Sequence, residues 1–170
     1  TNDDLALTID TSDEWIYSRT GIHSRFFCEK EENCTSLAIQ AAKLALTRSG
    51  LAPEQIGCCI CATISGDYAT PSVSCLVQQA LGLPENIPVM DINAACSGFI
   101  YALETARRFL NESAPYALII GVEQLSRLLD MTDRSTCVLF GDGGGAAIVE
   151  VVPESPHAAI LGARGGLEIQ

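Results

Sequence analysis

Residues 89–99, VMDINAACSGF, decide the fold of this chain. A run that predicts a strand from Ile87 to about Ile92 passes into small residues and then into Cys96 and Gly98. An apolar stripe at helical spacing begins immediately afterwards, formed by Phe99, Leu103, Ala106 and Leu110. The segment therefore predicts a turn from a buried strand into a helix, with Cys96 at the turn.

The sequence before this turn alternates between helix and strand signals. Thr35 and Ser36 are candidate N-cap residues for a helix that ends at Gly50, and residues 56–63 (IGCCICAT) then predict a strand buried on both faces. Thr70 and Pro71 predict the start of a second helix. Gly82 ends that helix in the same way as Gly50 ends the first.

The sequence after the turn continues the pattern and then changes. Residues 116–121 (YALIIG) predict a further buried strand. Two strand-like runs, 137–140 and 146–152, flank the glycines of 141–145 and predict a hairpin, and residues 159–161 predict one more strand. Repeated alternation of strand and helix predicts an α/β fold with a mostly parallel, mixed sheet flanked by helices.

Composition and charge limit the class of protein. The 170 residues are 48% hydrophobic with a mean hydropathy of +0.24, which indicates a globular chain of one domain. The acidic first 30 residues do not resemble a signal peptide, and no apolar run approaches the roughly 20 residues of a membrane span. A net charge of −11 argues against nucleic acid and anionic membranes as partners. We therefore expect a cytoplasmic protein with its eight cysteines reduced.

Cys96 is the candidate nucleophile. At the start of a helix, free backbone N–H groups and the helix dipole favour a thiolate, which lowers a thiol pKa and raises its reactivity. The alternative reading is a small buried core residue, since free cysteine is among the most buried residue types. Composition alone favours that alternative.

Three separate stretches favour the nucleophile. Residues 10–22 (DTSDEWIYSRTGI), 91–103 (DINAACSGFIYAL) and 140–147 (FGDGGGAA) resemble, in order, the N-terminal signature, nucleophile motif and glycine-rich hairpin of the beta-ketoacyl-ACP synthase III family. The resemblance implies a thiolase-like fold and 3-oxoacyl-[acyl-carrier-protein] synthase III activity, which initiates fatty acid biosynthesis. In that reaction Cys96 takes the acyl group of an acyl-CoA primer, and malonyl-ACP then loses carbon dioxide and attacks the acyl-cysteine. The resemblance further implies a homodimer that uses no cofactor.

The resemblance also assigns substrate contacts. Trp15 and Arg134 match the pair that sandwiches the adenine of CoA in this family, and Arg19 and Thr11 match positions that contact the nucleotide. Arginine stacks on aromatic planes and pairs with phosphate, so these residue types suit the ligand. Thr70 matches the position that reaches across the dimer interface and limits the acyl pocket of the neighbouring subunit, where threonine leaves more room than a large aromatic residue.

The resemblance covers nearly all of residues 1–170 but only the N-terminal half of the family's length, without its first strand. The histidine and asparagine that act on the malonyl thioester lie in the other half. The chain is interpreted as a fragment of a longer enzyme, with two alternatives: one subunit of a split enzyme, or a non-catalytic half-module or scaffold subunit. Among enzymes, the alternatives are related cysteine acyltransferases of secondary metabolism or of hydroxymethylglutaryl-CoA synthesis.

Other possible sites are interpreted as structural. Cys58 and Cys61 have the CxxC spacing of metal sites, but residues three apart on a strand point to opposite faces, so no metal site is predicted. The glycines of 141–145 lack the lysine of a phosphate-binding P-loop. His23 is interpreted as a surface or nucleotide-side residue and His157 as a solvated loop residue.

Overall fold

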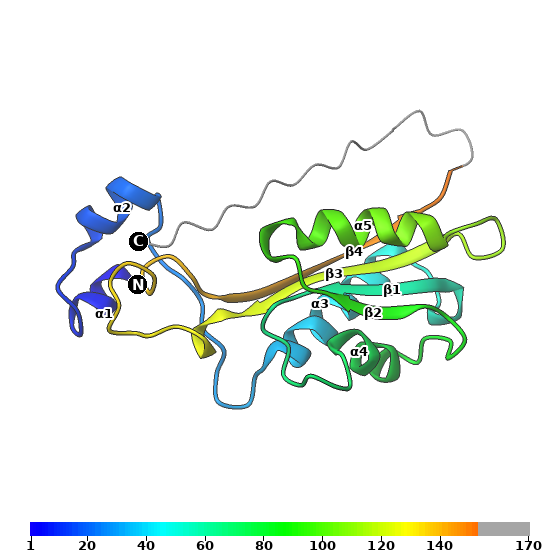
Figure 1. The fold of residues 1–170 in the computed structure, drawn as a ribbon, viewed down its shortest axis with the longest axis horizontal. Helices are drawn as coiled ribbons and strands as arrows, with labels where there is room; N and C mark the ends of the chain where they lie inside the picture. The colour runs from blue at the N-terminus through cyan, green and yellow to red at the C-terminus, as the bar shows by residue number, and fades with distance from the viewer. Residues whose placement is uncertain (153–170) are drawn as a thin grey trace.

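A four-stranded mixed sheet is the centre of the computed structural model, which describes residues 1–152 (Figure 1). The strand order is β2-β1-β3-β4, and β1 pairs in parallel with both β2 and β3, whereas β4 is antiparallel to β3. The strands are β1 (Ile56–Ala62), β2 (Val89–Ile92), β3 (Tyr116–Gln124) and β4 (Asp142–Glu150). The mixed, mostly parallel sheet predicted from the sequence is confirmed.

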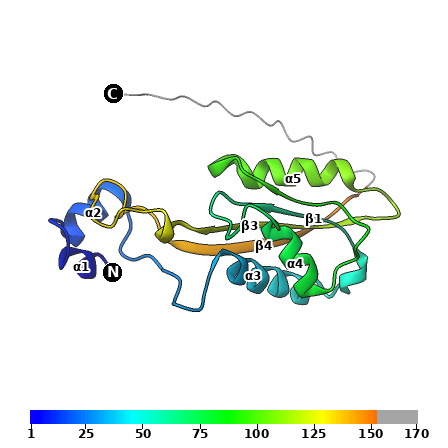
Figure 2. The ribbon, with the colours of Figure 1, turned by 60° about the horizontal axis from the view of Figure 1, so that its bottom comes forward.

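Helices cover both faces of this sheet (Figures 1 and 2). Helix α5 (Gly98–Phe109) packs on one face, where Cys58 contributes to the core, and α3 (Cys34–Ser49) and α4 (Val73–Leu81) pack on the other, where Cys61 does. The prediction that the two cysteines of the CxxC point to opposite faces is therefore confirmed. Because both faces are covered, β1, which pairs on both sides, is apolar throughout in the run IGCCICA.

The helices begin at different residues from those predicted. The N-cap of α3 is Asn33, whose side chain accepts a hydrogen bond from Ser36 N (2.8 Å), and the N-cap of α4 is Ser72. Thr70 and Pro71 precede α4, because Asp91 at the end of β2 accepts hydrogen bonds from the first two backbone N–H groups of that helix, 2.8 and 2.9 Å long. The predicted ends, Gly50 and Gly82, are confirmed as left-handed C-caps.

The predicted glycine-rich hairpin is wrong. Residues 137–140 form turns, and the glycines 143–145 lie inside β4, which pairs with the full length of β3. A Cβ added to Gly144 would lie 3.1 Å from the Val122 side chain and 3.5 Å from the Leu37 carbonyl oxygen. Gly144 thus allows close packing within a strand, and the glycine run does not form a turn. The predicted strand at 159–161 and His157 lie outside the described residues.

The N-terminal residues form a small unit beyond one end of the sheet (Figure 1). Helices α1 (Asn2–Ala6) and α2 (Asp13–Thr20) share a small core with Cys137 and Val138 of the segment that precedes β4. Arg25 links α1 to the segment that precedes β4, because its guanidinium donates to Asn2 Oδ1 (2.8 Å) and to the Val138 carbonyl oxygen (2.7 Å).

Three short 3₁₀ helices complete the described structure, η1 (Pro53–Gln55), η2 (Ala95–Ser97) and η3 (Leu125–Arg127). Among the helices within residues 1–152, none has the length and apolar character to cross a membrane.

We predict that Gly57→Ala destabilises the fold by about 1–3 kcal/mol, as overpacking of a tight site does. An added Cβ at Gly57 would lie 2.6 Å from the Ala114 Cβ and 3.2 Å from its Cα. Gly145→Ala is the matched control on β4, because nothing lies within 4 Å of an added Cβ there. Urea unfolding of both variants measures the difference, and equal midpoints would contradict the close contact.

Candidate active site

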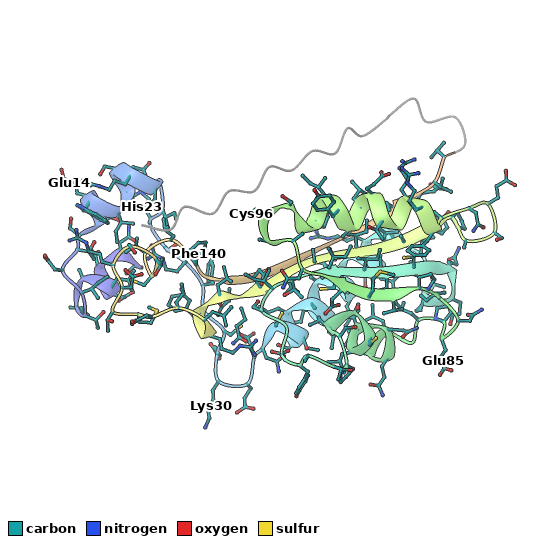
Figure 3. All side chains as sticks on the ribbon, viewed as in Figure 1. Glu14, His23, Lys30, Glu85, Cys96 and Phe140 are labelled. Carbon is teal, nitrogen blue, oxygen red and sulfur yellow. The ribbon has the colours of Figure 1, made fainter. Side chains whose placement is uncertain are left out.

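Cys96 lies in η2, between the end of β2 and the start of α5 (Figure 3). It is exposed, whereas the other seven cysteines are buried or partly buried. The predicted strand-to-helix turn is confirmed, and the alternative of a buried core cysteine is wrong. The preceding residue, Ala95, has a φ of 45°, a left-handed conformation that is uncommon for a residue other than glycine. The turn therefore holds the backbone beside Cys96 in a strained conformation.

Small residues bring the turn close to the sheet. A Cβ added to Gly98 would lie 3.1 Å from the Ala62 Cβ, and one added to Gly121 would lie 3.2 Å from the Phe99 ring. Glycine at these positions lets the first turn of α5 pack directly on the ends of β1 and β3. Larger residues at either position would push the start of α5, which follows Cys96 directly, away from the sheet.

A hollow of about 400 Å³ opens beside Cys96, and its exposed lining is almost entirely apolar. Its lining residues come from the end of β3, from the segments that follow β1, β2 and β3, and from the segment before β4: Ile64, Ala95, Cys96, Glu123, Leu125, Leu128, Leu129 and Phe140. An apolar hollow of this size suits a hydrocarbon chain rather than a polar ligand. Of these residues, the sequence had indicated Cys96 as the nucleophile and Ala95 as one of the small residues before it that leave room for a substrate.

Glu123 is the one charged residue in that lining. Its carboxylate accepts hydrogen bonds from Ile64 N (3.0 and 3.2 Å) and from the hydroxyl groups of Thr63 and Ser65. The carboxylate thus accepts these hydrogen bonds from the loop that follows β1. A charged residue near the end of an otherwise buried strand is a sequence signal that could have identified it.

Three of the four predicted nucleotide-binding residues, Trp15, Arg19 and Arg134, meet at the N-terminal unit. The guanidinium carbons of Arg19 and Arg134 each lie 4.4 Å from the centroid of the Trp15 ring. Arg19 donates to the Trp15 carbonyl oxygen (3.2 Å) and Arg134 to the Asp10 carbonyl oxygen (2.7 Å). A hollow of about 260 Å³ adjoins them and is lined by Ser12, Glu14, Trp15, Ser18 and Arg19.

The remaining predicted residues lie apart from these two hollows. The Thr11 hydroxyl is buried without a hydrogen-bond partner in the described structure, and Thr11 lines neither hollow. Thr70 is exposed and does not line the Cys96 hollow. His23 is exposed, stacks on Tyr17 with ring centroids 3.9 Å apart, and contacts Asp13 through Nδ1 (2.9 Å). The assigned roles of Thr11 and Thr70 therefore stay predictions.

Several of the other cysteines have raised pKa values. Burial raises the pKa of the Cys58 thiol to about 11 and that of the Cys59 thiol to about 12. Burial and the nearby Asp142 carboxylate raise the pKa of Cys28 to about 11. No cluster of three or more potential metal ligands occurs within residues 1–152.

Comparisons with known proteins agree with this geometry. A family model described as 3-oxoacyl-[acyl-carrier-protein (ACP)] synthase III matches residues 90–166, which include Cys96. The beta-ketoacyl-[acyl-carrier-protein] synthase III of Coxiella burnetii is 45% identical over 155 residues, which are 90% of this chain and 49% of that protein. That of Helicobacter hepaticus is 48% identical over 164 residues, 95% of this chain and 48% of that protein.

This chain matches the N-terminal part of the 3-oxoacyl-[acyl-carrier-protein] synthase III family. The crystal structure of the synthase III from Aquifex aeolicus aligns with a TM-score of 0.85 at 48% identity, and the alignment covers 91% of this chain and 50% of that one. The thiolase-like fold inferred from the resemblance is thus shown. The chain spans about half the length of the synthase III relatives that it matches.

We predict that iodoacetamide labels Cys96 at least about tenfold faster than the buried cysteines, because reactivity follows exposure and thiolate content. Peptide mapping after partial labelling at pH 8 measures the order of reaction. Cys96→Ala should remove the fast phase, and Cys75→Ser, at a partly buried cysteine, should retain it. A fast phase that survives Cys96→Ala would contradict the assignment.

Proposed function

We propose that this chain supplies the nucleophile and the CoA-binding residues of a 3-oxoacyl-[acyl-carrier-protein] synthase III. The observation that carries the proposal is the exposed Cys96 at a strand-to-helix turn, beside an apolar hollow that suits an acyl chain. A cysteine thiolate attacks thioesters readily, and the hollow holds the acyl group next to it.

The proposed reaction has two steps. In the first, the Cys96 thiolate attacks the thioester carbonyl of an acyl-CoA, the acyl–sulfur bond to CoA breaks, and CoA leaves as the thiolate. In the second, malonyl-ACP loses carbon dioxide, and the resulting carbanion attacks the acyl-Cys96 carbonyl. The new carbon–carbon bond forms as Cys96 leaves as the thiolate, which gives a 3-oxoacyl-ACP and the free enzyme.

The first step is the one for which this chain carries residues. The guanidinium groups of Arg19 and Arg134 lie over the Trp15 ring, so an adenine that stacks on Trp15 would displace one of them, and the two arginines offer positive charge for phosphate groups. The second step relies on the histidine and asparagine that the family places in its other half. We further propose that the enzyme is cytoplasmic and acts as a homodimer, in which Thr70 limits the acyl pocket of the neighbouring subunit.

Incubation with acetyl-CoA or octanoyl-CoA should add one acyl group, and that group should map to Cys96. The first step needs only the thiolate, the hollow and the CoA contacts, so the chain alone should react, although slowly. Intact mass followed by peptide mapping measures the product, and Cys96→Ala is the control. Failure of the folded chain to react with either thioester, while iodoacetamide still labels Cys96, would contradict the proposal for this chain.

Titration with CoA should change the fluorescence of Trp15, which is the only tryptophan in the sequence. Arg134→Ala should weaken CoA binding by about tenfold, because a stacked guanidinium that pairs with phosphate contributes on the order of 1 kcal/mol or more. Arg108→Ala is the matched control, since Arg108 lies on α5 and pairs with Glu104. Equal affinities for the two variants would contradict the assigned nucleotide site.

A further inference from the structure

The loop that follows β1, residues 63–67, forms one wall of the Cys96 hollow through Ile64. The Ile64 side chain is 42% exposed, and Ile64 is not part of the buried core clusters of the described structure. Its position beside the hollow therefore depends on what holds the loop backbone. Two charged side chains about sixty residues further along the chain, Glu123 and Arg127, hold the loop backbone. Neither takes part in the reaction proposed above.

Glu123 holds the loop from the end of β3. Its carboxylate accepts the Ile64 backbone N–H at 3.0 and 3.2 Å and the Thr63 hydroxyl at 3.4 Å. The Ser65 hydroxyl also donates to this carboxylate. The same hydroxyl accepts a hydrogen bond from the Gln124 backbone N–H (2.7 Å). Hydrogen bonds to an ionised carboxylate are stronger than those between neutral groups, so Ile64 N is firmly held.

Arg127, in η3, holds the other end of the loop. Its guanidinium donates to the carbonyl oxygens of Ser65 (2.7 Å) and Gly66 (2.9 Å) and pairs with Asp67 (3.2 Å). The Asp67 carboxylate is mostly buried and also accepts the Thr35 backbone N–H (2.7 Å) at the start of α3. The loop is thus tied to β3, η3 and α3 together.

We propose that Glu123 and Arg127 are positioning residues that fix Ile64 against the hollow and so set which acyl chain lengths reach Cys96. The proposal rests on the function proposed above, since it concerns the same hollow. Glu123 places a charged carboxylate in an otherwise apolar lining. Its hydrogen bonds to the loop offset the free-energy cost of placing the charge there. Loss of either anchor frees the Ile64 wall, while the turn that carries Cys96 remains supported by β2 and α5.

The test uses reagents that need no enzyme activity. Methyl and n-octyl methanethiosulfonate both transfer their alkylthio group to a thiolate: the new disulfide forms at Cys96 and methanesulfinate leaves. The two differ only in the alkyl chain that must lie in the hollow. The ratio of the octyl to the methyl rate at Cys96, measured by intact mass and peptide mapping, therefore reports on the hollow and not on general exposure of the thiol.

Glu123→Gln and Arg127→Lys should each lower that ratio by about fourfold. The reason is that one methylene of the octyl chain that loses its contact with the hollow changes the octyl rate by roughly that factor. The glutamine amide nitrogen cannot accept the Ser65 hydroxyl, and lysine cannot donate to two carbonyl groups and Asp67 in the same fixed geometry. The methyl rate should change by less than about twofold, as expected of a side chain that does not touch the thiol. Glu150→Gln is the matched control, because Glu150 lies at the opposite end of the β3–β4 pair.

An unchanged ratio in folded variants, or an equal fall in both rates, would overturn the proposal, since the second result indicates general damage to the turn. Circular dichroism establishes folding, and if Glu123→Gln does not fold, Arg127→Lys decides alone, because Arg127 is 40% exposed and tolerates change. Labelling with acyl-CoA is a separate measurement. A changed thiosulfonate ratio without acyl transfer would support the positioning role and count against the proposed function only.

Discussion

Parallel pairing of β1 with β2 and β3 is the constraint on which the rest of this structure depends. Adjacent parallel strands end at the same edge of a sheet, so the loops that follow them must meet there. In this chain those loops bring Ile64, Cys96 and Leu125 to one hollow, although they lie far apart in the sequence. The pairing requires helices on both faces, and these helices in turn require that β1, which is covered on both faces, be apolar throughout. The composition of β1 and the place of the nucleophile thus have one cause.

The features that depend on near neighbours could be predicted from the sequence. The turn around Cys96, the left-handed caps at Gly50 and Gly82, and the opposite orientation of Cys58 and Cys61 each follow from a few adjacent residues. The resemblance to the synthase III family also selected Trp15 and Arg134, which the structure brings together from opposite ends of the described chain. Spacing alone contains no signal for that contact.

The features that depend on distant partners could not be predicted. The N-cap of α4 is Ser72 rather than Thr70 because Asp91, on β2, accepts hydrogen bonds from the first backbone N–H groups of the helix. The glycines of 143–145 continue a strand because they pair with β3, where Gly144 packs against Val122 and Leu37, whereas their local signal is that of a turn. The charge of Glu123 near the end of a buried strand was a local signal, but what its carboxylate binds could not be predicted. Its partners in the loop after β1 are about sixty residues away in the sequence.

The same chain contains eight cysteines, and position in the fold separates one from the rest. Cys58 and Cys59 lie in a strand covered on both faces, where burial penalises the thiolate and raises the pKa. Cys96 follows a strand instead of lying within one, so the same residue type is exposed at the edge where the loops meet. The covered sheet raises the pKa of these buried thiols, whereas residues at the edge where its loops meet line the hollow beside Cys96. Protection of most thiols and exposure of one are therefore two results of a single packing arrangement.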